Sequence, residues 1–155
     1  MHDDRTKHEF RALREIVGLD RDELAKLTGA TLANVAAWEN PQRREFPPDA
    51  AWEIVYELVA RQQSAVDETY MLVSDVEKES GKLPRLVAVP YWLSAADYER
   101  MHLERDDDTW KEANATSRAV ARMLWELDVG VRFYDGSRGI DAPNDENERP
   151  DLRLV

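Results

Sequence analysis

The sequence predicts a mainly α-helical protein with an N-terminal bundle of short helices, a long connecting helix and a small C-terminal α/β segment. Three observations support this fold class. Residues 13–39 carry apolar side chains at helical spacing on both sides of a glycine, and residues 49–79 continue helical spacing over about thirty positions. Between residues 84 and 134, two short β-type runs flank a helical pattern.

The N-terminal segment, residues 1–48, predicts three short helices. The first runs from about residue 7 to residue 17. The second begins near Asp20, whose carboxylate suits an N-cap, and ends before Gly29, which can adopt the positive φ of a tight turn. The third covers residues 32–39.

The apolar positions predict how these helices pack. Ala25 is small enough for two helices to cross closely over it. The larger side chains expected to point inward are Phe10, Leu13, Ile16, Val17, Leu24, Leu27, Val35 and Trp38. Thr31 can cap the third helix, which leaves an outward face to meet a partner. That face carries Leu32, Ala33, Asn34, Ala36 and Ala37.

A long helix is expected over residues 49–79, with a heptad-like apolar row. The row consists of Ala51, Ile54, Leu58, Ala65, Leu72 and Val76. Such a helix would span roughly 45 Å, which is more than a small bundle needs for itself. It is therefore expected to link two units. The alternative is a pair of helices broken near residues 62–64.

A small α/β dimerisation segment is expected over residues 84–134, after a boundary at residues 80–84. Residues 86–89 and 129–134 predict two strands. The sequence leaves open whether these strands pair within one chain or between two chains. Residues 135–155 are rich in Asp, Asn, Pro and Arg, and predict a flexible acidic tail.

Two helices are expected between these strands. Ser94 can cap a short helix that continues to about His102. Thr109 and Glu112 have capping-box spacing at the start of a longer helix. The three aspartates at residues 106–108 precede that helix, and a favourable interaction with the helix dipole explains them better than a cation site does.

The net charge of −11 is unevenly distributed. Residues 1–46 carry eight Lys and Arg against nine Asp and Glu, whereas residues 47–155 carry thirteen against twenty-three. The negative charge therefore lies mostly outside the N-terminal bundle, where Arg21, Lys26 and residues 43–44 can form a local basic edge. This distribution argues against tight non-specific coating of nucleic acid, but not against a specific, salt-sensitive site.

Composition disfavours several protein classes. The absence of cysteine excludes disulfides, thiol catalysis and cysteine-type zinc sites. No apolar run approaches the roughly 20 residues of a membrane span. The first ten residues lack the apolar segment of a signal peptide, so a cytoplasmic location with no membrane partner is expected. His2, His8 and His102 have no metal-ligand spacing. Because no nucleophile–base pair or phosphate-cradling loop is present, we expect neither an enzyme nor a bound cofactor.

One group of residues has the spacing of a helix-turn-helix unit: Leu13-Arg14, Gly18-Leu19, Glu23-Leu24-Ala25, Gly29, Val35 and Trp38-Glu39. Residues 7–60 thereby resemble the lambda-repressor-like Cro/repressor (Xre-type) family of transcriptional regulators. The residues Trp38-Glu39, the loop that ends in residues 46–49 and the long apolar helix are similar to its YdiL-like branch. That branch also places a small α/β segment after the head, and anti-CRISPR-associated autorepressors belong to the same broad group.

The resemblance implies roles for individual residues. Arg14 and Glu39 match a buried pair that fastens the first helix to the third. Arg21 and Thr31 match positions that contact phosphate, although the family often has glutamine where this chain has Arg21. The full set implied to contact DNA is Arg21, Thr31, Leu32, Ala33, Asn34, Ala36, Ala37, Asn40, Gln42, Arg43 and Arg44.

The implied reading face is poor in hydrogen-bonding side chains. Leu32, Ala33 and Ala37 have no side-chain donor or acceptor, so only Asn34 on this helix has an ordinary polar side chain that can hydrogen-bond to a base. A good bidentate contact supplies about 1–3 kcal/mol of discrimination between bases. Specificity is therefore expected from Asn34, from DNA shape, and from the arginines at residues 43–44.

Two functional hypotheses of different class remain. The leading one is a transcriptional repressor that binds double-stranded DNA as a homodimer, on an inverted repeat at the promoter of its own operon. The alternative is an antitoxin-like or adaptor protein whose acidic C-terminal half binds a protein partner. The two overlap, because antitoxins often repress their own operons. RNA binding is a weaker option, since no aromatic platform of the RNP type is present.

Overall fold

The computed structural model describes residues 4–101, 109–134 and 150–154. These residues form six helices and one three-stranded parallel sheet, which confirms the expected mainly helical fold with a small α/β segment. The chain divides into two compact units, residues 1–63 and 64–155. The boundary between the units therefore lies within the long helix and not after it.

The first unit begins with three short helices whose limits agree with the predicted ones to within one or two residues. They are α1 (Lys7–Ile16), α2 (Arg21–Thr28) and α3 (Leu32–Trp38). Asp20 caps α2, because its side chain accepts from the Glu23 backbone N–H at 2.8 Å. Gly29 ends α2 in the left-handed region with a φ of 68°, as its position in the sequence predicts.

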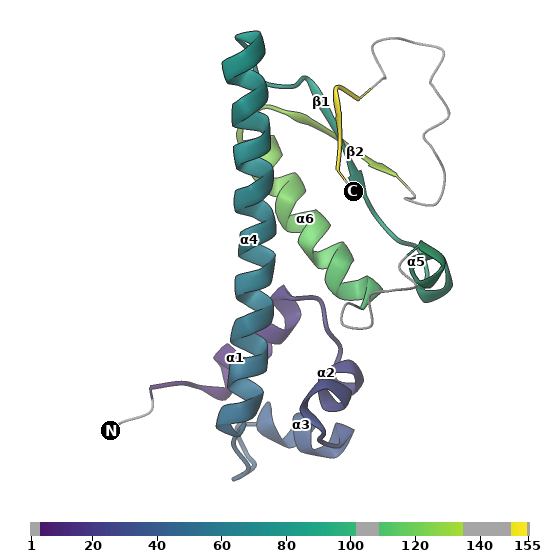
Figure 1. The fold of residues 1–155 in the computed structure, drawn as a ribbon. Coiled ribbons are helices and arrows are strands. Elements are labelled where there is room, and N and C mark those ends of the chain that lie inside the picture. Colours follow the sequence, from purple (N-terminus) through teal and green to yellow (C-terminus); the bar gives the residue numbers. More distant parts are fainter. Residues whose placement is uncertain (1–3, 102–108, 135–149, 155) are drawn as a thin grey trace. The chain divides into compact units, whose positions relative to one another are not determined.

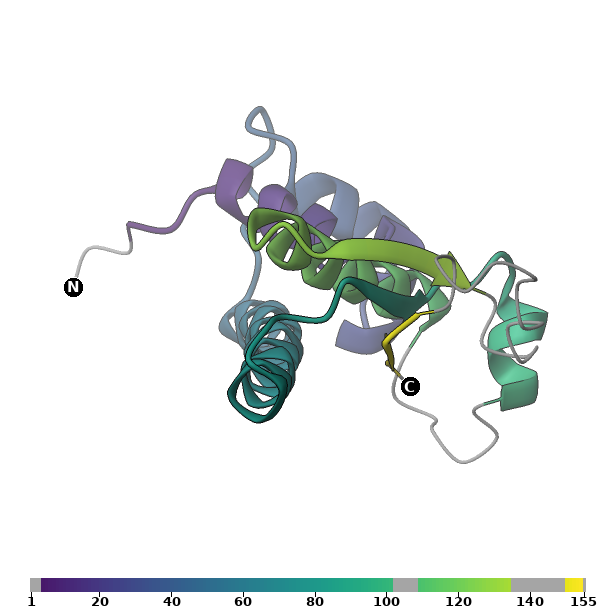
Figure 2. The same cartoon turned by 90° about the horizontal axis from the view of Figure 1, so that it is seen from above.

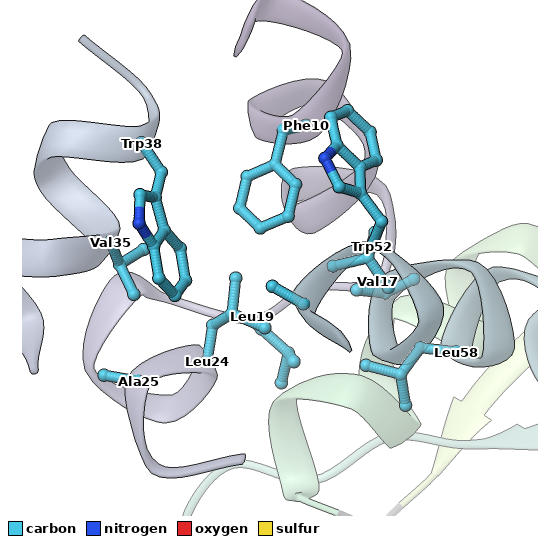
Figure 3. Packing of buried hydrophobic residues seen from close by; sticks show 11 residues of the cluster. Phe10, Val17, Leu19, Leu24, Ala25, Val35, Trp38, Trp52 and Leu58 are labelled. Atoms are coloured by element: carbon cyan, nitrogen blue, oxygen red, sulfur yellow. The ribbon is translucent and has the colours of Figure 1, made fainter. Parts of the chain in front are cut away.

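Phe10 is at the centre of the core of this unit. Its ring meets the rings of Trp38 and Trp52 edge-on, at centroid distances of 6.0 and 5.0 Å (Figure 3). Trp52 belongs to α4 (Asp49–Ser80), so the first turns of the long helix complete the bundle. The other buried residues of the cluster are Val17, Leu19, Leu24, Ala25, Val35, Ala51, Val55 and Leu58.

Two residues that the sequence predicts to be inward are exposed: Ile16 and Leu27. On its helix, each of these residues lies beside the row of side chains that faces the core. Val17 and Leu24 occupy the inward positions, and a short helix can turn only a narrow stripe of residues toward the core.

The long helix α4 is a single helix of 32 residues, so the alternative with a break near residues 62–64 is wrong (Figure 1). Its apolar row is only partly buried. Ala51 and Leu58 lie in the core of the first unit, whereas Leu72 is exposed and its neighbour Val73 is fully buried in the second unit. The second unit thus buries Val73 in place of the predicted Leu72.

The second unit is a strand–helix–helix–strand segment completed by a short third strand. Its elements are β1 (Leu86–Pro90), α5 (Ala95–Met101), α6 (Trp110–Glu126), β2 (Gly130–Tyr134) and β3 (Leu152–Arg153). All three strands are parallel and β1 lies in the middle, in the order β2-β1-β3 (Figure 2). The two expected strands therefore pair within one chain.

The core of the second unit lies between α6, α4 and one face of the sheet. Val87 and Val89 of β1 join Val120 and Leu124 of α6, together with Val73 of α4. Because side chains alternate along a strand, this face of β1 carries the odd-numbered valines. The sheet is thus anchored on α6, as parallel sheets require.

The tail was expected to be flexible over residues 135–155, and this is wrong for its last part. Asp151 accepts from the backbone N–H of Arg85 at 2.7 Å and donates its own N–H to Leu86 O at 2.8 Å. Leu154 N–H donates to Ala88 O at 2.9 Å. These bonds give the side of β1 that faces away from β2 a hydrogen-bonding partner. Residues 135–149, His102 and the aspartates at residues 106–108 lie outside the described part of the chain.

Replacement of Phe10 by alanine should lower the stability of the first unit by about 3–5 kcal/mol, because it leaves a cavity between two indole rings. Urea unfolding of the full chain, followed at the amide resonances of residues 7–60, would measure this loss. The matched control is Leu32→Ala, which removes an exposed apolar side chain and should change stability by less than about 0.5 kcal/mol. Equal effects of the two substitutions would contradict this account of the core.

Candidate nucleic-acid interface

The short helix α3 presents one exposed face to solvent. Leu32 is 53% exposed, Ala33 and Asn34 are also exposed, and Ala36 is half-buried. This arrangement agrees with the outward face that the sequence predicts for the N-terminal part of the helix. It is an apolar face with a single amide.

Ala37 does not belong to that face. It was expected to point outward, but only 9% of its surface is exposed. The reason is that α3 has only seven residues, and its last turn is packed into the core through Trp38. The candidate reading surface is therefore shorter than the sequence predicts and ends near Ala36.

Thr31 and Asn34 cap the helix reciprocally. The Thr31 hydroxyl accepts from the Asn34 backbone N–H at 3.1 Å and donates to Asn34 Oδ1 at 2.8 Å. Asn34 Oδ1 also accepts from the Thr31 backbone N–H at 3.1 Å. The only proton of the hydroxyl is thus already donated, and the amide oxygen is used twice. What remains for a partner is the pair of N–H donors on Asn34 Nδ2.

A buried ion cluster joins the three short helices. The Glu39 side chain has no exposed surface, and it accepts from two arginines. Arg14 reaches both of its oxygens, through Nε to Oε1 and through Nη2 to Oε2 at 3.0 Å. Arg21 donates from Nε to Oε2 at 2.7 Å. The sequence-predicted pair of Arg14 and Glu39 is therefore present, and Arg21 is a third member.

This cluster changes the role of Arg21. Two guanidinium groups and one carboxylate leave an excess of one positive charge. The Arg14 side chain is almost completely buried, whereas that of Arg21 is 40% exposed. Because Nε is bound to Glu39, only the terminal nitrogens of Arg21 can reach a partner. Arg21 is thus positioned by the fold and still exposes part of its charge.

The pKa of Glu39 is lowered despite its burial. Burial by itself would raise the pKa, since it disfavours the charged form. Hydrogen bonds from Arg14 and Arg21, together with their positive charges, outweigh that effect. The carboxylate is therefore ionised under ordinary conditions, as the two arginine partners require.

The loop after α3 is held by a residue that the sequence gives no reason to select. Lys7 Nζ donates to the carbonyl oxygens of Ala37, Asn40 and Arg43, at 2.9, 2.8 and 2.8 Å. An ammonium group has three N–H donors, so all of them are used on the backbone of this loop. The carbonyl acceptors lie 30–36 residues away along the chain, which is why local sequence patterns do not reveal the contact.

Four residues of this loop were predicted to contact DNA, and all four are exposed: Asn40, Gln42, Arg43 and Arg44. Asn40 Oδ1 accepts from the Gln42 N–H at 2.9 Å, so this side chain shapes the turn. Arg43 is paired with Glu45 at 2.8 Å, and this ion pair lowers the pKa of Glu45 to about 2. Arg44 makes no side-chain hydrogen bond or ion pair with any residue that the structure describes.

The two loop arginines are therefore not equivalent. Glu45 competes with an outside anion for Arg43, and it places a negative charge beside the loop. Arg44 carries the positive charge of the loop that has no intramolecular competitor among the described residues. The sequence pattern groups the two arginines and does not select Glu45. The signal that points to the ion pair is the position of Glu45 two residues after Arg43.

Comparison of the chain with models of known protein families gives no match, and comparison with curated proteins gives none. The resemblance of residues 7–60 to Xre-type regulators thus stays a prediction from the residues. None of the described helices is long and apolar enough to cross a membrane. Within the same part of the chain, no three His, Cys, Asp or Glu side chains form a group that could hold a metal ion.

Replacement of Glu39 by glutamine should destabilise the first unit by about 3 kcal/mol at pH 7, because two arginines lose their buried counter-charge. The pH dependence follows from the lowered pKa. As the pH falls below the ordinary glutamate value of about 4.3, the unfolded chain takes up this proton before the folded chain does. Glu39 therefore stabilises the fold at neutral pH, and this contribution is lost in acid.

The measurement is urea unfolding of the full chain at pH 7 and at pH 3, read at residues 7–60. The difference between wild type and Glu39→Gln should shrink at the lower pH. Asp22→Asn is the matched control, since Asp22 is an exposed carboxylate paired with Lys26 and not with the arginines that bind Glu39 among the described residues. A difference that is independent of pH would show that Glu39 is not a stabilising anion.

Replacement of Lys7 by methionine should loosen the loop, because the three carbonyl contacts are lost while the side chain keeps its length. Loss of such partly exposed bonds is worth about 1 kcal/mol, so the Arg43 amide should exchange with solvent roughly fivefold faster. Hydrogen exchange of the full chain measures this rate. Lys26→Met removes an equally charged exposed side chain and should leave the loop unchanged; if it had the same effect, the loss of charge alone would be responsible.

Proposed function

We propose that this chain is a sequence-specific DNA-binding transcriptional repressor of the Xre type, which acts as a homodimer on an inverted repeat at the promoter of its own operon. In this proposal α2 and α3 are a helix-turn-helix unit, and α3 is its recognition helix. The observation that carries the proposal is the exposed N-terminal face of α3 and the loop that follows this helix. Lys7 holds the backbone of that loop, and Arg44 in the loop has no partner among the described residues.

In the proposed complex, the contacts with the DNA backbone come from both sides of α3. Arg44 would bind phosphate from the loop, and the terminal nitrogens of Arg21 would do so from the start of α2. The Arg21 guanidinium is held by the Glu39 carboxylate, and Lys7 holds the backbone carbonyl of Arg43, the neighbour of Arg44. A guanidinium that is already held in place, as that of Arg21 is, loses less conformational freedom when it binds.

Base reading would combine one amide with an apolar surface. The Nδ2 group of Asn34 can donate to an acceptor in the major groove, while Leu32 and Ala33 can pack on thymine methyl groups. The Thr31 hydroxyl and the Asn34 oxygen are occupied by the helix cap. Direct readout is therefore narrow, and DNA shape would supply further specificity.

A dimer would present two such faces to one side of the duplex. Recognition helices of helix-turn-helix dimers enter adjacent major grooves about 34 Å apart, which corresponds to one helical turn. An inverted repeat with this spacing is thus the expected operator. With a net charge of −11, the chain should bind unrelated DNA weakly, so that specific contacts decide where it binds.

Selection of binding sites from random duplex DNA with the full-length protein tests this proposal. The expected result is an enriched inverted repeat whose half-sites lie about one turn apart. On the enriched site, Arg44→Ala should reduce affinity and lower the slope of log affinity against log salt by about 1, because one phosphate contact is lost. Asn34→Ala should change the preferred bases.

Arg122→Ala is the matched control for the loss of charge, since Arg122 is exposed on α6 outside the first unit. It should leave affinity and salt slope close to those of wild type. The proposal fails if no sequence is enriched. It also fails if replacement of Asn34, Arg43 and Arg44 together by alanine leaves binding unchanged.

A second function, that of an antitoxin-like or adaptor protein, is favoured by the charge of the remaining chain. Residues 47–155 carry ten more acidic than basic side chains. Five carboxylates are exposed along the second half of α4: Asp67, Glu68, Asp75, Glu77 and Glu79. Such a surface fits a basic protein partner. A stable, salt-sensitive complex between the full chain and such a partner, without selection of any DNA site, would establish this function instead.

A further inference from the structure

The second unit contains a hollow of about 270 Å³ that the proposed DNA contacts do not involve. It lies between α4, α6 and the end of the sheet. Its apolar wall is formed by Ala65, Leu72, Val89, Pro90, Val120 and Leu154. The volume is close to the lower end of the range for small-molecule pockets, which begins at about 300 Å³.

The hollow is placed where α/β proteins commonly bind ligands. Val89 and Pro90 are the last residues of β1, and Leu154 follows β3. In open parallel sheets, the carboxyl ends of the strands form the crevice in which ligands lie. The position of the hollow is therefore set by the strand direction and not by an accident of loop packing.

Two hydroxyl groups in this lining, those of Ser117 and Thr116 on α6, have no hydrogen-bond partner among the described residues. Ser117 of α6 is only 7% exposed, and its hydroxyl makes no hydrogen bond with any residue that the structure describes. The neighbouring Thr116 hydroxyl has no described partner either. Both hydroxyls are therefore available to a bound molecule, as donors and as acceptors.

The remaining polar groups of the lining favour a donor over an acceptor. The Thr69 hydroxyl donates to Ala65 O at 2.9 Å, so that its oxygen can only accept from a ligand. Glu68, at the exposed side, makes no ion pair with another described residue. No lysine, arginine or histidine is among the residues that line this hollow. The lining residues therefore contribute a carboxylate and three hydroxyl groups, and no cationic side chain.

We propose that this hollow binds a small organic amine, with the ammonium group near Glu68 and the hydroxyl oxygens and the apolar body against Val89, Val120 and Leu154. The charge of the lining disfavours anions, because none of its side chains could balance a second negative charge. This site does not depend on DNA binding, since all of its residues belong to the second unit.

The test is a titration of the full-length protein with hexylamine, which is protonated at pH 7, followed at the methyl resonances of Val89, Val120 and Leu154. Hexanol and hexanoate have the same chain with a neutral or negative head group. Hexylamine should shift these resonances in a saturable way, hexanol should bind more weakly, and hexanoate should leave them unchanged. Glu68→Gln should weaken hexylamine binding by up to about fivefold, the effect of an exposed ion pair, and leave hexanol binding unaltered.

Asp75→Asn is the matched control, since it removes an exposed carboxylate from the same helix outside the hollow. Both substitutions are at exposed positions, so both variants should fold. The proposal is overturned if hexylamine produces no saturable shift, or if hexanoate binds equally well. It is also overturned if Glu68→Gln weakens hexylamine binding no more than Asp75→Asn does.

Discussion

One carboxylate connects the three short helices on which the candidate interface depends. Glu39 ends α3, Arg14 comes from α1 and Arg21 begins α2, and all three side chains meet at the two oxygens of Glu39. Arg14 also donates from Nη1 to Leu19 O at 2.8 Å, so that it fixes the segment between α1 and α2. A buried charge of this kind is tolerated only with its partners in place. These hydrogen bonds therefore hold the three helices together in addition to the apolar core around Phe10.

The parts of the fold that were predictable are those with local causes. Asp20, Gly29 and Thr31 set helix limits through contacts within three or four residues, and the structure has them as predicted. The Lys7 contacts and the strand β3 were not predictable, because their partners lie 30 or more residues away. For the candidate site, the sequence identified the exposed residues Leu32, Ala33, Asn34 and Arg44, but burial of Ala37 depends on how α3 packs against the rest of the bundle.

The same side chains hold the N-terminal unit together and limit what it can offer to a partner. Asn34 uses its oxygen and Thr31 its hydroxyl proton in the cap of α3, and Arg21 uses Nε on Glu39. In the proposed complex with DNA, recognition would therefore rely on rigid placement of a few remaining donors. Such an interface gains affinity by losing little freedom on binding, and it gains specificity from shape more than from many bonds.

The short strand β3 determines which backbone groups stay open along one side of the sheet. Residues 152–153 cover one side of β1, the central strand of the sheet, and the preceding Asp151 carboxylate binds the backbone at its start. Without these few residues, the backbone donors and acceptors along that side of β1 would lose their partners. An open edge on an apolar strand is a template for pairing with other chains. Residues 152–153 thus cover this side of β1 and leave a strand of only two residues at the edge, which offers few backbone groups for pairing with another chain.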